Sequence, residues 1–228
     1  MSDASIAAAT GIPVSFVGAI RAVESGGDPS AVRFEPHVFW RIQKGLPGNA
    51  TGAQIYAALS VAELAQVPYT PGKTDWRATH GLSPCHISRA ASCSGAETNA
   101  AAFQRAYGVA PTTAVRATSF GSFQVLGGDL LALYANNAAQ AVAAFRANPV
   151  AISDALLIHF LNVTKPRAKA AAIVGDVPSF VSAYNGCSDC SVYIQKFNRA
   201  LHGGGSGGGI IGGLALALGA AALWKWLG

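Results

Sequence analysis

Charged side chains are scarce in this chain of 228 residues, in which Asp, Glu, Lys and Arg together make up 12%. No Lys/Arg-rich run occurs and the formal net charge is only +5, so a basic nucleic-acid-binding domain is not expected. Because 51% of the residues are hydrophobic, the composition also excludes an intrinsically disordered chain. The small positive charge favours encounter with anionic polymers such as cell walls, nucleic acids or anionic lipids, without choosing among them.

A signal peptide and a histidine metal site are both missing from the sequence. The first residues, MSDASIAAATGIP, contain no basic segment leading into an apolar run, so we expect no secretory signal peptide and delivery by another component. The five histidines form no His-x₃-His pair and have no Asp or Glu at ligand spacing, which disfavours a zinc amidase. We predict no metal and no cofactor.

Cysteine is rare, and its four copies fall into two local pairs, Cys85 with Cys93 and Cys187 with Cys190. Each pair is a candidate for a small disulfide loop. The alternative is one zinc site built from all four, since Cys-x₂-Cys is a common zinc spacing whereas Cys-x₇-Cys is not. A third interpretation is unlinked thiols. The sequence leaves these three possibilities open.

Strand-like alternation is also scarce, whereas apolar residues recur at helical spacing through most of the chain. We therefore expect a mostly α-helical single domain over residues 1–202. Residues 28–41 are expected to be extended or irregular, and 68–95 to form a long surface excursion. Helices are predicted at 3–24 (divided near Gly11 and Pro13), 52–59, 61–66 (capped by Ser60), 96–107, 138–147, 150–163, 166–174, 176–185 and 191–201.

The C-terminal residues differ from the rest of the chain. Residues 203–209 read GGGSGGG, a flexible linker by composition. Residues 210–228 are almost entirely apolar, and the 18 uncharged residues 207–224 would span ~27 Å as a helix, close to the ~30 Å of a bilayer core. Trp224, Lys225 and Trp226 are typical interfacial anchors. This pattern predicts a membrane-associated helix. The alternatives are a helix packed on the domain or on a partner, and a membrane-disrupting peptide.

Three short segments carry the chemistry: VESGG at 23–27, SFGSFQVLG at 119–127 and AYNG at 183–186. In this order they resemble the signature of the goose-type lysozyme and lytic transglycosylase superfamily. With RFEPHVF at 33–39, and with Tyr193 and Lys196 beyond the last motif, the set is similar to the N-acetylmuramidase family of phage endolysins. The resemblance covers about 15–201. It departs in the cysteine-rich regions, and no separate wall-binding module is present.

The resemblance implies a lysozyme-like fold and two carboxylates of interest. Glu24 ends a helix at Ser25-Gly26-Gly27, and an apolar setting would raise its pKa enough for it to act as the catalytic acid. Glu35 is either a base that activates water or a brace that forms an ion pair with Arg33, Arg41 or His37. Relatives that work with one essential Glu imply that it need not be catalytic. The resemblance places substrate-binding roles on Ser25, Phe34, His37, Ser119, Phe123, Gln124, Tyr184 and Asn185.

The predicted function is cleavage of the β-1,4 bond between N-acetylmuramic acid and N-acetylglucosamine in peptidoglycan, by a phage endolysin or virion-associated lysin. The alternatives are a lytic transglycosylase and a non-catalytic virion structural or wall-binding protein on a lysozyme scaffold. The expected partners are peptidoglycan, a membrane through the tail, and virion proteins, with no nucleic acid. The expected location is the phage virion or the host cell envelope.

Overall fold

The computed structural model describes residues 1–79, 98–187 and 189–203. Two predictions fall outside the described residues: the disulfide between Cys85 and Cys93, and the hydrophobic helix of 210–228. Within the described ranges, helices predominate and the sequence expectation of a mostly α-helical domain is confirmed.

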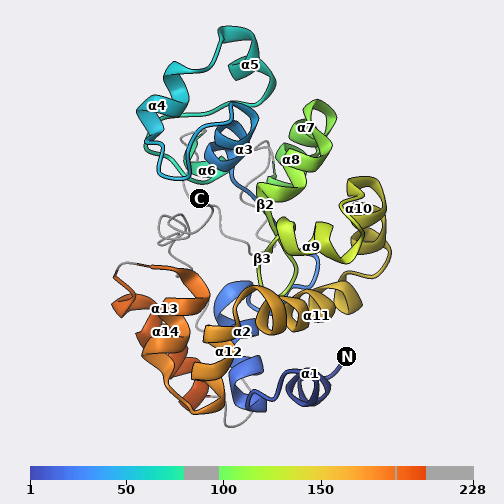
Figure 1. Cartoon of the computed structure of the whole chain (residues 1–228), viewed down its shortest axis with the longest axis vertical. Coiled ribbons are helices and arrows are strands. Elements are labelled where there is room, and N and C mark those ends of the chain that lie inside the picture. Colours follow the sequence, from blue (N-terminus) through green and yellow to red (C-terminus); the bar gives the residue numbers. More distant parts are fainter. Residues whose placement is uncertain (80–97, 188, 204–228) are drawn as a thin grey trace.

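The helices gather at two ends of the molecule, with a small sheet between them (Figure 1). One end contains α3 (Pro36–Gln43), α4 (Gly52–Ala57), α5 (Val61–Gln66), α6 (Trp76–Thr79), α7 (Asn99–Val109) and α8 (Pro111–Arg116). The middle contains β1 (Val32–Phe34), β2 (Thr118–Phe120), β3 (Val125–Leu126), α9 (Gly127–Leu133) and α10 (Ala138–Ala147). The other end contains α1 (Asp3–Thr10), α2 (Val14–Glu24), α11 (Pro149–His159), the π-helix η2 (Phe160–Thr164), α12 (Pro166–Ile173), α13 (Val177–Asn185) and α14 (Ser191–His202).

Local signals account for most helix boundaries. Ser60 caps α5 as expected, and it forms a reciprocal capping box with Glu63. The division between α1 and α2 falls at Gly11, whose φ of 78° provides the left-handed end of α1. The expectation that 28–41 is extended or irregular is confirmed at β1, which is extended, and was wrong from Pro36 onward, where α3 begins. Pro36 starts α3 rather than preventing it, since a proline at the first helical position loses no hydrogen bond.

The three-stranded antiparallel sheet has the order β1-β2-β3. Arg33 pairs with Ser119, and Val32 pairs with Phe120. Successive side chains of a strand point to opposite faces, so Arg33 and Ser119 share one face and the two apolar residues share the other. The sheet therefore carries a polar face, which contributes to the site described below.

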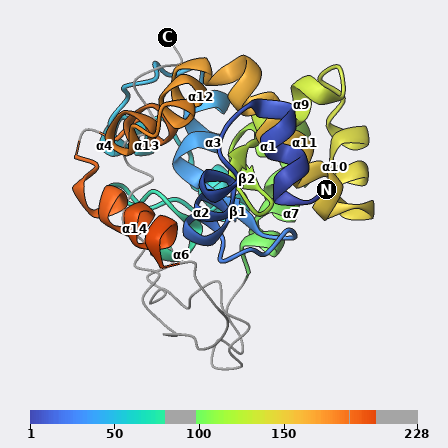
Figure 2. The same ribbon diagram turned by 90° about the horizontal axis from the view of Figure 1, so that it is seen from below.

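A cluster of three phenylalanines fixes the helices that carry the C-terminal half of the site. The ring of Phe16 in α2 lies 5.4 Å from those of Phe180 in α13 and Phe197 in α14, centroid to centroid. Phe180 and Phe197 are 5.0 Å apart, and all three side chains are buried. As a result α14 runs along α2, which both views show (Figure 1 and Figure 2).

Cys187 and Cys190 form a disulfide, with their Cα atoms 5.4 Å apart. The prediction of a local disulfide is therefore confirmed for Cys187 and Cys190. The alternative zinc site of Cys85, Cys93, Cys187 and Cys190 was wrong, because a zinc ion would need the last two as separate thiolates. The other local disulfide, between Cys85 and Cys93, stays a prediction, since neither Cys85 nor Cys93 belongs to the described residues.

Helix length bears on whether the described part of the chain could cross a membrane. Within it, no single helix combines the length and apolar composition that a membrane span needs. Helices α1 and α2 together have the required length and apolar composition, but the chain bends by 116° between them.

Candidate active site

Glu24 is the last residue of α2, and the backbone turns away directly after it. Gly26 and Gly27 have φ values of 65° and 90°, in the left-handed region that the sequence predicted for this helix end. Tyr193 of α14 donates a hydrogen bond from its hydroxyl to Glu24 Oε1. The carboxyl is therefore held both by its own helix end and by the neighbouring helix.

Burial determines the protonation state of Glu24. Removal from water raises the pKa of this carboxyl from its ordinary 4.5 to about 7. The hydrogen bond from Tyr193 and the positive charges of Arg33 and Lys196 oppose this effect and lower the pKa. The result is a carboxyl that keeps its proton up to about neutral pH, as a general acid must.

Glu35 has a different setting. It precedes Pro36 at the start of α3, and its side chain is only 2% exposed. Arg33 Nε lies 3.9 Å from one carboxyl oxygen, and His37 Nε2 lies 3.9 Å from the other. Burial raises the pKa of Glu35 to about 7, and the charge of Arg33 partly opposes this. Arg33 therefore acts on both carboxyls, Glu24 and Glu35.

His37 is fixed and uncharged at neutral pH. Burial lowers its pKa to about 4, and Nδ1 lies 2.7 Å from the carbonyl oxygen of Thr74. Its side chain is 11% exposed. The contact with Glu35 is therefore one between a neutral ring and a carboxyl, rather than an ion pair.

The raised pKa of Glu35 predicts a pH-dependent stability. A carboxyl whose pKa is about 7 in the folded state and 4.5 in the unfolded state binds its proton more tightly when folded. The free energy of unfolding should therefore fall as pH rises from about 4.5 to about 7, by on the order of 3 kcal/mol for this group, and then level off. Glu35→Gln removes this contribution, so urea unfolding at several pH values should show a shallower decline.

Glu63→Gln is the matched control for this measurement. The hydrogen bond from Lys44, followed by those from Ser60, lowers the pKa of Glu63 to about 2, so its contribution is lost only as pH falls below 4.5. The control should keep the slope of the wild type between pH 5 and 7. An equally steep decline in Glu35→Gln would show that Glu35 does not titrate with a raised pKa.

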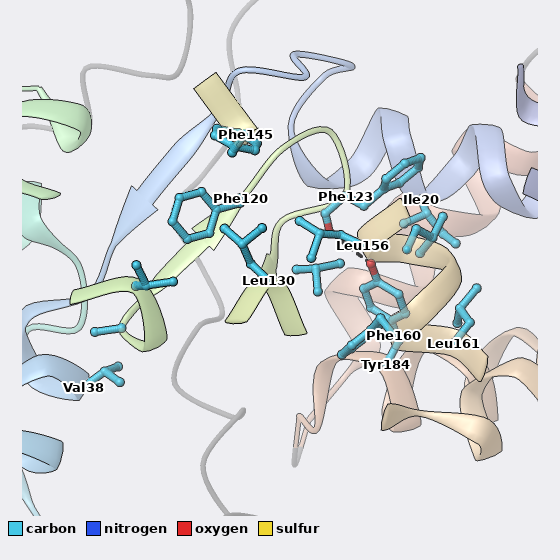
Figure 3. Packing of buried hydrophobic residues seen from close by; sticks show 14 of the residues in the cluster. Ile20, Val38, Phe120, Phe123, Leu130, Phe145, Leu156, Phe160, Leu161 and Tyr184 are labelled. Carbon is cyan, nitrogen blue, oxygen red and sulfur yellow. Dashed lines mark hydrogen bonds between the residues drawn. The ribbon is translucent and has the colours of Figure 1, made fainter. Parts of the chain in front are cut away.

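Hydrogen bonds join the three sequence motifs, although they are far apart in the chain. Ser25 Oγ, next to Glu24, donates to the carbonyl of Ser122 at 2.8 Å. Tyr184 Oη, near the end of α13, donates to the carbonyl of Phe123 at 2.9 Å. Figure 3 shows the Tyr184 ring against Phe160, with its hydroxyl directed toward Phe123. The turn that follows β2 is thus held between the ends of α2 and α13.

Several of the predicted substrate-binding side chains are buried in this framework. Phe34 and Phe123 are wholly buried, and Ser25, Ser119 and Tyr184 are each at most 7% exposed. They position the site rather than present a surface to a ligand. Tyr184 in particular packs on Phe160 and Phe180, so its ring is not free to stack on a sugar.

Gln124 and Asn185 have polar groups suited to a ligand. Gln124 is partly exposed and has a φ of 49°, unusual for a residue other than glycine. Its Nε2 donates to the carbonyl of Gly121 at 3.0 Å. Asn185 is 8% exposed, and its buried Nδ2 has no hydrogen-bond partner among the described residues. A buried amide donor without a partner is rare in folded proteins and is often explained by a ligand.

Three residues act on Glu24 although the sequence analysis predicted no such role: Tyr193 and Lys196, which it named only as part of the motif set, and Arg33. Their effect on Glu24 depends on the packing of α14 against α2 and on the polar face of the sheet. The three-residue spacing of Tyr193 and Lys196, which puts both on one helix face, was the available signal. Within the described ranges, no group of three or more His, Cys, Asp or Glu side chains is arranged to hold a metal ion.

Glu24 is a protonatable glutamate at a helix end, and the adjacent Ser25 hydrogen-bonds to the turn after β2. An acid of this kind in a helical domain is what a lysozyme-like glycoside hydrolase uses. The model of the N-acetylmuramidase family, Muramidase, matches residues 13–203, and the chain belongs to this family. It is accordingly a muramidase that acts on peptidoglycan, and a non-catalytic virion protein is not favoured.

No match was found among the curated proteins. Among solved structures, the fold is similar to the crystal structure of the Burkholderia AP3 phage endolysin, with a TM-score of 0.56 and 21% sequence identity. The likeness covers 88% of this chain and 67% of the endolysin chain, and it confirms the lysozyme-like fold.

Proposed function

We propose that the protein is a phage lysin that hydrolyses the β-1,4 bond between N-acetylmuramic acid and N-acetylglucosamine, with Glu24 as the general acid. The observation that carries the proposal is the setting of Glu24: a partly buried carboxyl, with a pKa of about 7, held by Tyr193 at the end of α2. Membership of the N-acetylmuramidase family supports the substrate. The similar fold of a phage endolysin supports the phage origin.

In the proposed mechanism, protonated Glu24 donates its proton to the glycosidic oxygen that departs as the sugar becomes oxocarbenium-like. Water then forms the new bond to the anomeric carbon and loses a proton, which yields the reducing end and restores the protonated acid. The carboxylate left behind is stabilised by the Tyr193 hydroxyl and by the charges of Arg33 and Lys196. These three groups lower the pKa of Glu24 without abolishing the effect of burial. The acid is thus strong enough to give up its proton yet still protonated near neutral pH.

We assign Glu35 a bracing role. A general base must contact the water that it activates, and the Glu35 side chain is 2% exposed. Its carboxyl instead faces Arg33, which also acts on Glu24. Glu35 therefore fixes the guanidinium that helps to stabilise the Glu24 carboxylate.

We assign Gln124 and Asn185 to the recognition of acetamido and hydroxyl groups of the glycan. Asn185 Nδ2 has a hydrogen-bond capacity that no described residue uses. An acetamido carbonyl is an acceptor of matching chemistry. We assign the other predicted substrate-binding residues to the framework that positions Gln124, Asn185 and Glu24. They are Ser25, Ser119, Phe34, His37, Phe123 and Tyr184.

Replacing Tyr193 by phenylalanine should raise the pKa of Glu24, because the ring stays and the hydroxyl that stabilises the carboxylate is lost. An acid of higher pKa stays protonated to higher pH. The basic side of the pH–activity curve on purified peptidoglycan should therefore move upward, by on the order of one pH unit. Tyr56→Phe changes an exposed tyrosine of α4 and should leave the curve in place. A downward shift in Tyr193→Phe would contradict the assignment.

Mass analysis of the muropeptides released in H₂¹⁸O tests the proposed bond and outcome. Hydrolysis by a muramidase gives products that end in a reducing N-acetylmuramic acid carrying one ¹⁸O atom. A lytic transglycosylase gives unlabelled 1,6-anhydro ends, and a glucosaminidase gives reducing N-acetylglucosamine ends. Anhydro ends would overturn the proposed hydrolysis, and reducing N-acetylglucosamine ends would overturn the proposed choice of bond.

We further propose that residues 1–202 form the catalytic domain and that 210–228 bind lipid after the linker 203–209. The family match ends at residue 203, where the glycine-rich linker begins. Burial of five Leu, Ile or Trp side chains in lipid is worth on the order of 7–15 kcal/mol, at ~1.5–3 kcal/mol each. A lysin with such a tail would act at the host cell envelope or from the virion.

Ending the chain after Gly203 should abolish flotation with liposomes and preserve the degradation of purified peptidoglycan. The control replaces 210–228 with a Gly/Ser segment of equal length, which tests apolar character at constant length. Both altered proteins should remain folded and active on isolated walls. Unfolding or loss of activity in both would show instead that the tail completes the catalytic domain.

A further inference from the structure

We propose that Arg21 is a positioning residue for the reaction, which fixes the turn Gly121–Gln124 against the end of α2. The inference rests on the proposed roles of Glu24 and Gln124. Arg21 lies one helical turn before Glu24 on α2, and its guanidinium points toward the turn rather than toward solvent.

The first set of contacts joins Arg21 to the turn itself. Its Nη1 donates to Ser122 Oγ at 3.1 Å, and its guanidinium carbon lies 4.5 Å from the centre of the Phe123 ring. The two contacts need different properties of the same group, a directed N–H donor and a flat cationic face. Lysine has the charge but not the flat face.

The second set anchors the guanidinium from the opposite side. Nε and Nη2 donate to Asp3 Oδ1 at 3.2 and 2.8 Å. Nη2 also lies 3.3 Å from Oδ1 of Asp154, whose side chain is completely buried. Asp3 belongs to α1 and Asp154 to α11, so Arg21 connects two other helices to the turn.

The turn has a conformation that requires such support. Gly121 has a φ of 76° and Gln124 a φ of 49°, and a left-handed glutamine persists only where its surroundings hold it. Ser25 and Tyr184 hold the carbonyls of Ser122 and Phe123, and Arg21 holds their side chains. Gln124 is the next residue, so the position of its amide depends on this clamp.

Arg21 acts through position rather than through charge on the acid. The cations that lower the pKa of Glu24 are Arg33 and Lys196, from β1 and α14. The charge of Arg21 is paired with Asp3 and Asp154. Loss of Arg21 should therefore lower the turnover rate without moving the pH at which Glu24 loses its proton.

The test compares Arg21→Ala, Arg21→Lys and Ser122→Ala on soluble, uncross-linked glycan strands, with kcat expressed per folded molecule. Arg167→Ala, which removes an exposed arginine from α12, is the control for net charge. We expect kcat to fall by about tenfold or more in both Arg21 variants, since a small misplacement of a reacting group has effects of this size. Ser122→Ala should show a smaller loss, and millimolar guanidinium should restore part of the activity of Arg21→Ala only.

Unchanged kcat per folded molecule in Arg21→Lys and Ser122→Ala would overturn the proposal, and these milder variants decide it if Arg21→Ala does not fold. A shift of the basic side of the pH curve would also overturn it, by showing an effect of charge. Glu24→Gln is measured in parallel. Full activity in Glu24→Gln would refute the proposed function, whereas an inactive Glu24→Gln beside normal Arg21 variants would refute the positioning role alone.

Discussion

Glu24→Gln is expected to lower peptidoglycan-degrading activity by about 10²–10⁴-fold, the usual contribution of a general acid. Glutamine keeps the size of the side chain and can still accept the hydrogen bond from Tyr193. It has no proton to give to the departing oxygen. The fold should survive, because the carboxyl is already neutral below about pH 7 and the substitution adds no charge.

Clearing of purified cell walls measures the activity of this variant, and thermal unfolding measures its stability. Glu35→Gln is the matched control, since it makes the same chemical change at the other carboxyl with a raised pKa. It should lose less than about tenfold if Glu35 is a brace, far less than the loss of a general acid. Equal losses at the two positions would show that Glu35 takes part in the chemistry.

Gly121→Ala is expected to destabilise the protein by about 2–5 kcal/mol and to abolish most activity. A side chain at its φ of 76° is disfavoured by about 1–2 kcal/mol. A Cβ atom at this position would also overlap the hydroxyl of Ser153, which accepts a hydrogen bond from Ser122 N at 2.6 Å. Overpacking of this kind adds about 1–3 kcal/mol. The displaced turn carries Gln124, so activity is lost with stability.

Gly128→Ala provides a control only seven residues away. Gly128 lies within α9, and a Cβ added there meets no atom within 4 Å. Alanine should be neutral or stabilise this helix by up to about 1 kcal/mol. Urea unfolding measures both variants, and a Gly121→Ala protein as stable as the wild type would contradict the packing described.

Helices with clear end signals could be predicted from the sequence. Ser60 with Glu63, and Gly11 after α1, determine boundaries through local hydrogen bonds and backbone conformation, which are properties of adjacent residues. The short helices α8 and α9 were not predicted. Each has at most seven residues, too few to show a helical period, and neither begins with a side-chain cap such as those that mark α4 and α5. Their formation depends on tertiary contacts, such as the close approach of Gly127 to the carbonyl of Val115.

The state of the cysteines could be narrowed but not decided from the sequence. Spacing alone leaves a disulfide, a zinc site and unlinked thiols open for Cys187 and Cys190, because two residues between cysteines suit both linked forms. The structure decides for the disulfide at this pair, through the approach of the two sulfur atoms. For Cys85 and Cys93, which lie outside the described residues, the local disulfide remains a prediction from their spacing.

Glu24 could be named as the candidate acid from the sequence, but the contacts of each neighbour could not be predicted. The motif around Glu24 follows from residues that are adjacent in the chain. Phe123 and Tyr184 are typical sugar-binding residue types, yet the structure buries both and joins them by a hydrogen bond across 61 residues. Burial and long-range pairing depend on how helices pack, and a single sequence contains no readable pattern for this. For the same reason Arg33 could be linked to Glu35 but not to Glu24.

The pKa of Glu24, measured by titration of its ¹³C-labelled carboxyl in the NMR spectrum of the folded protein, tests the mechanism most directly. The signal is identified by its absence in Glu24→Gln. Burial at the end of α2 predicts a midpoint of about pH 7, coinciding with the basic side of the kcat/KM curve on peptidoglycan strands. A midpoint near the ordinary 4.5, with activity that continues undiminished above it, would contradict the role of Glu24 as the proton donor.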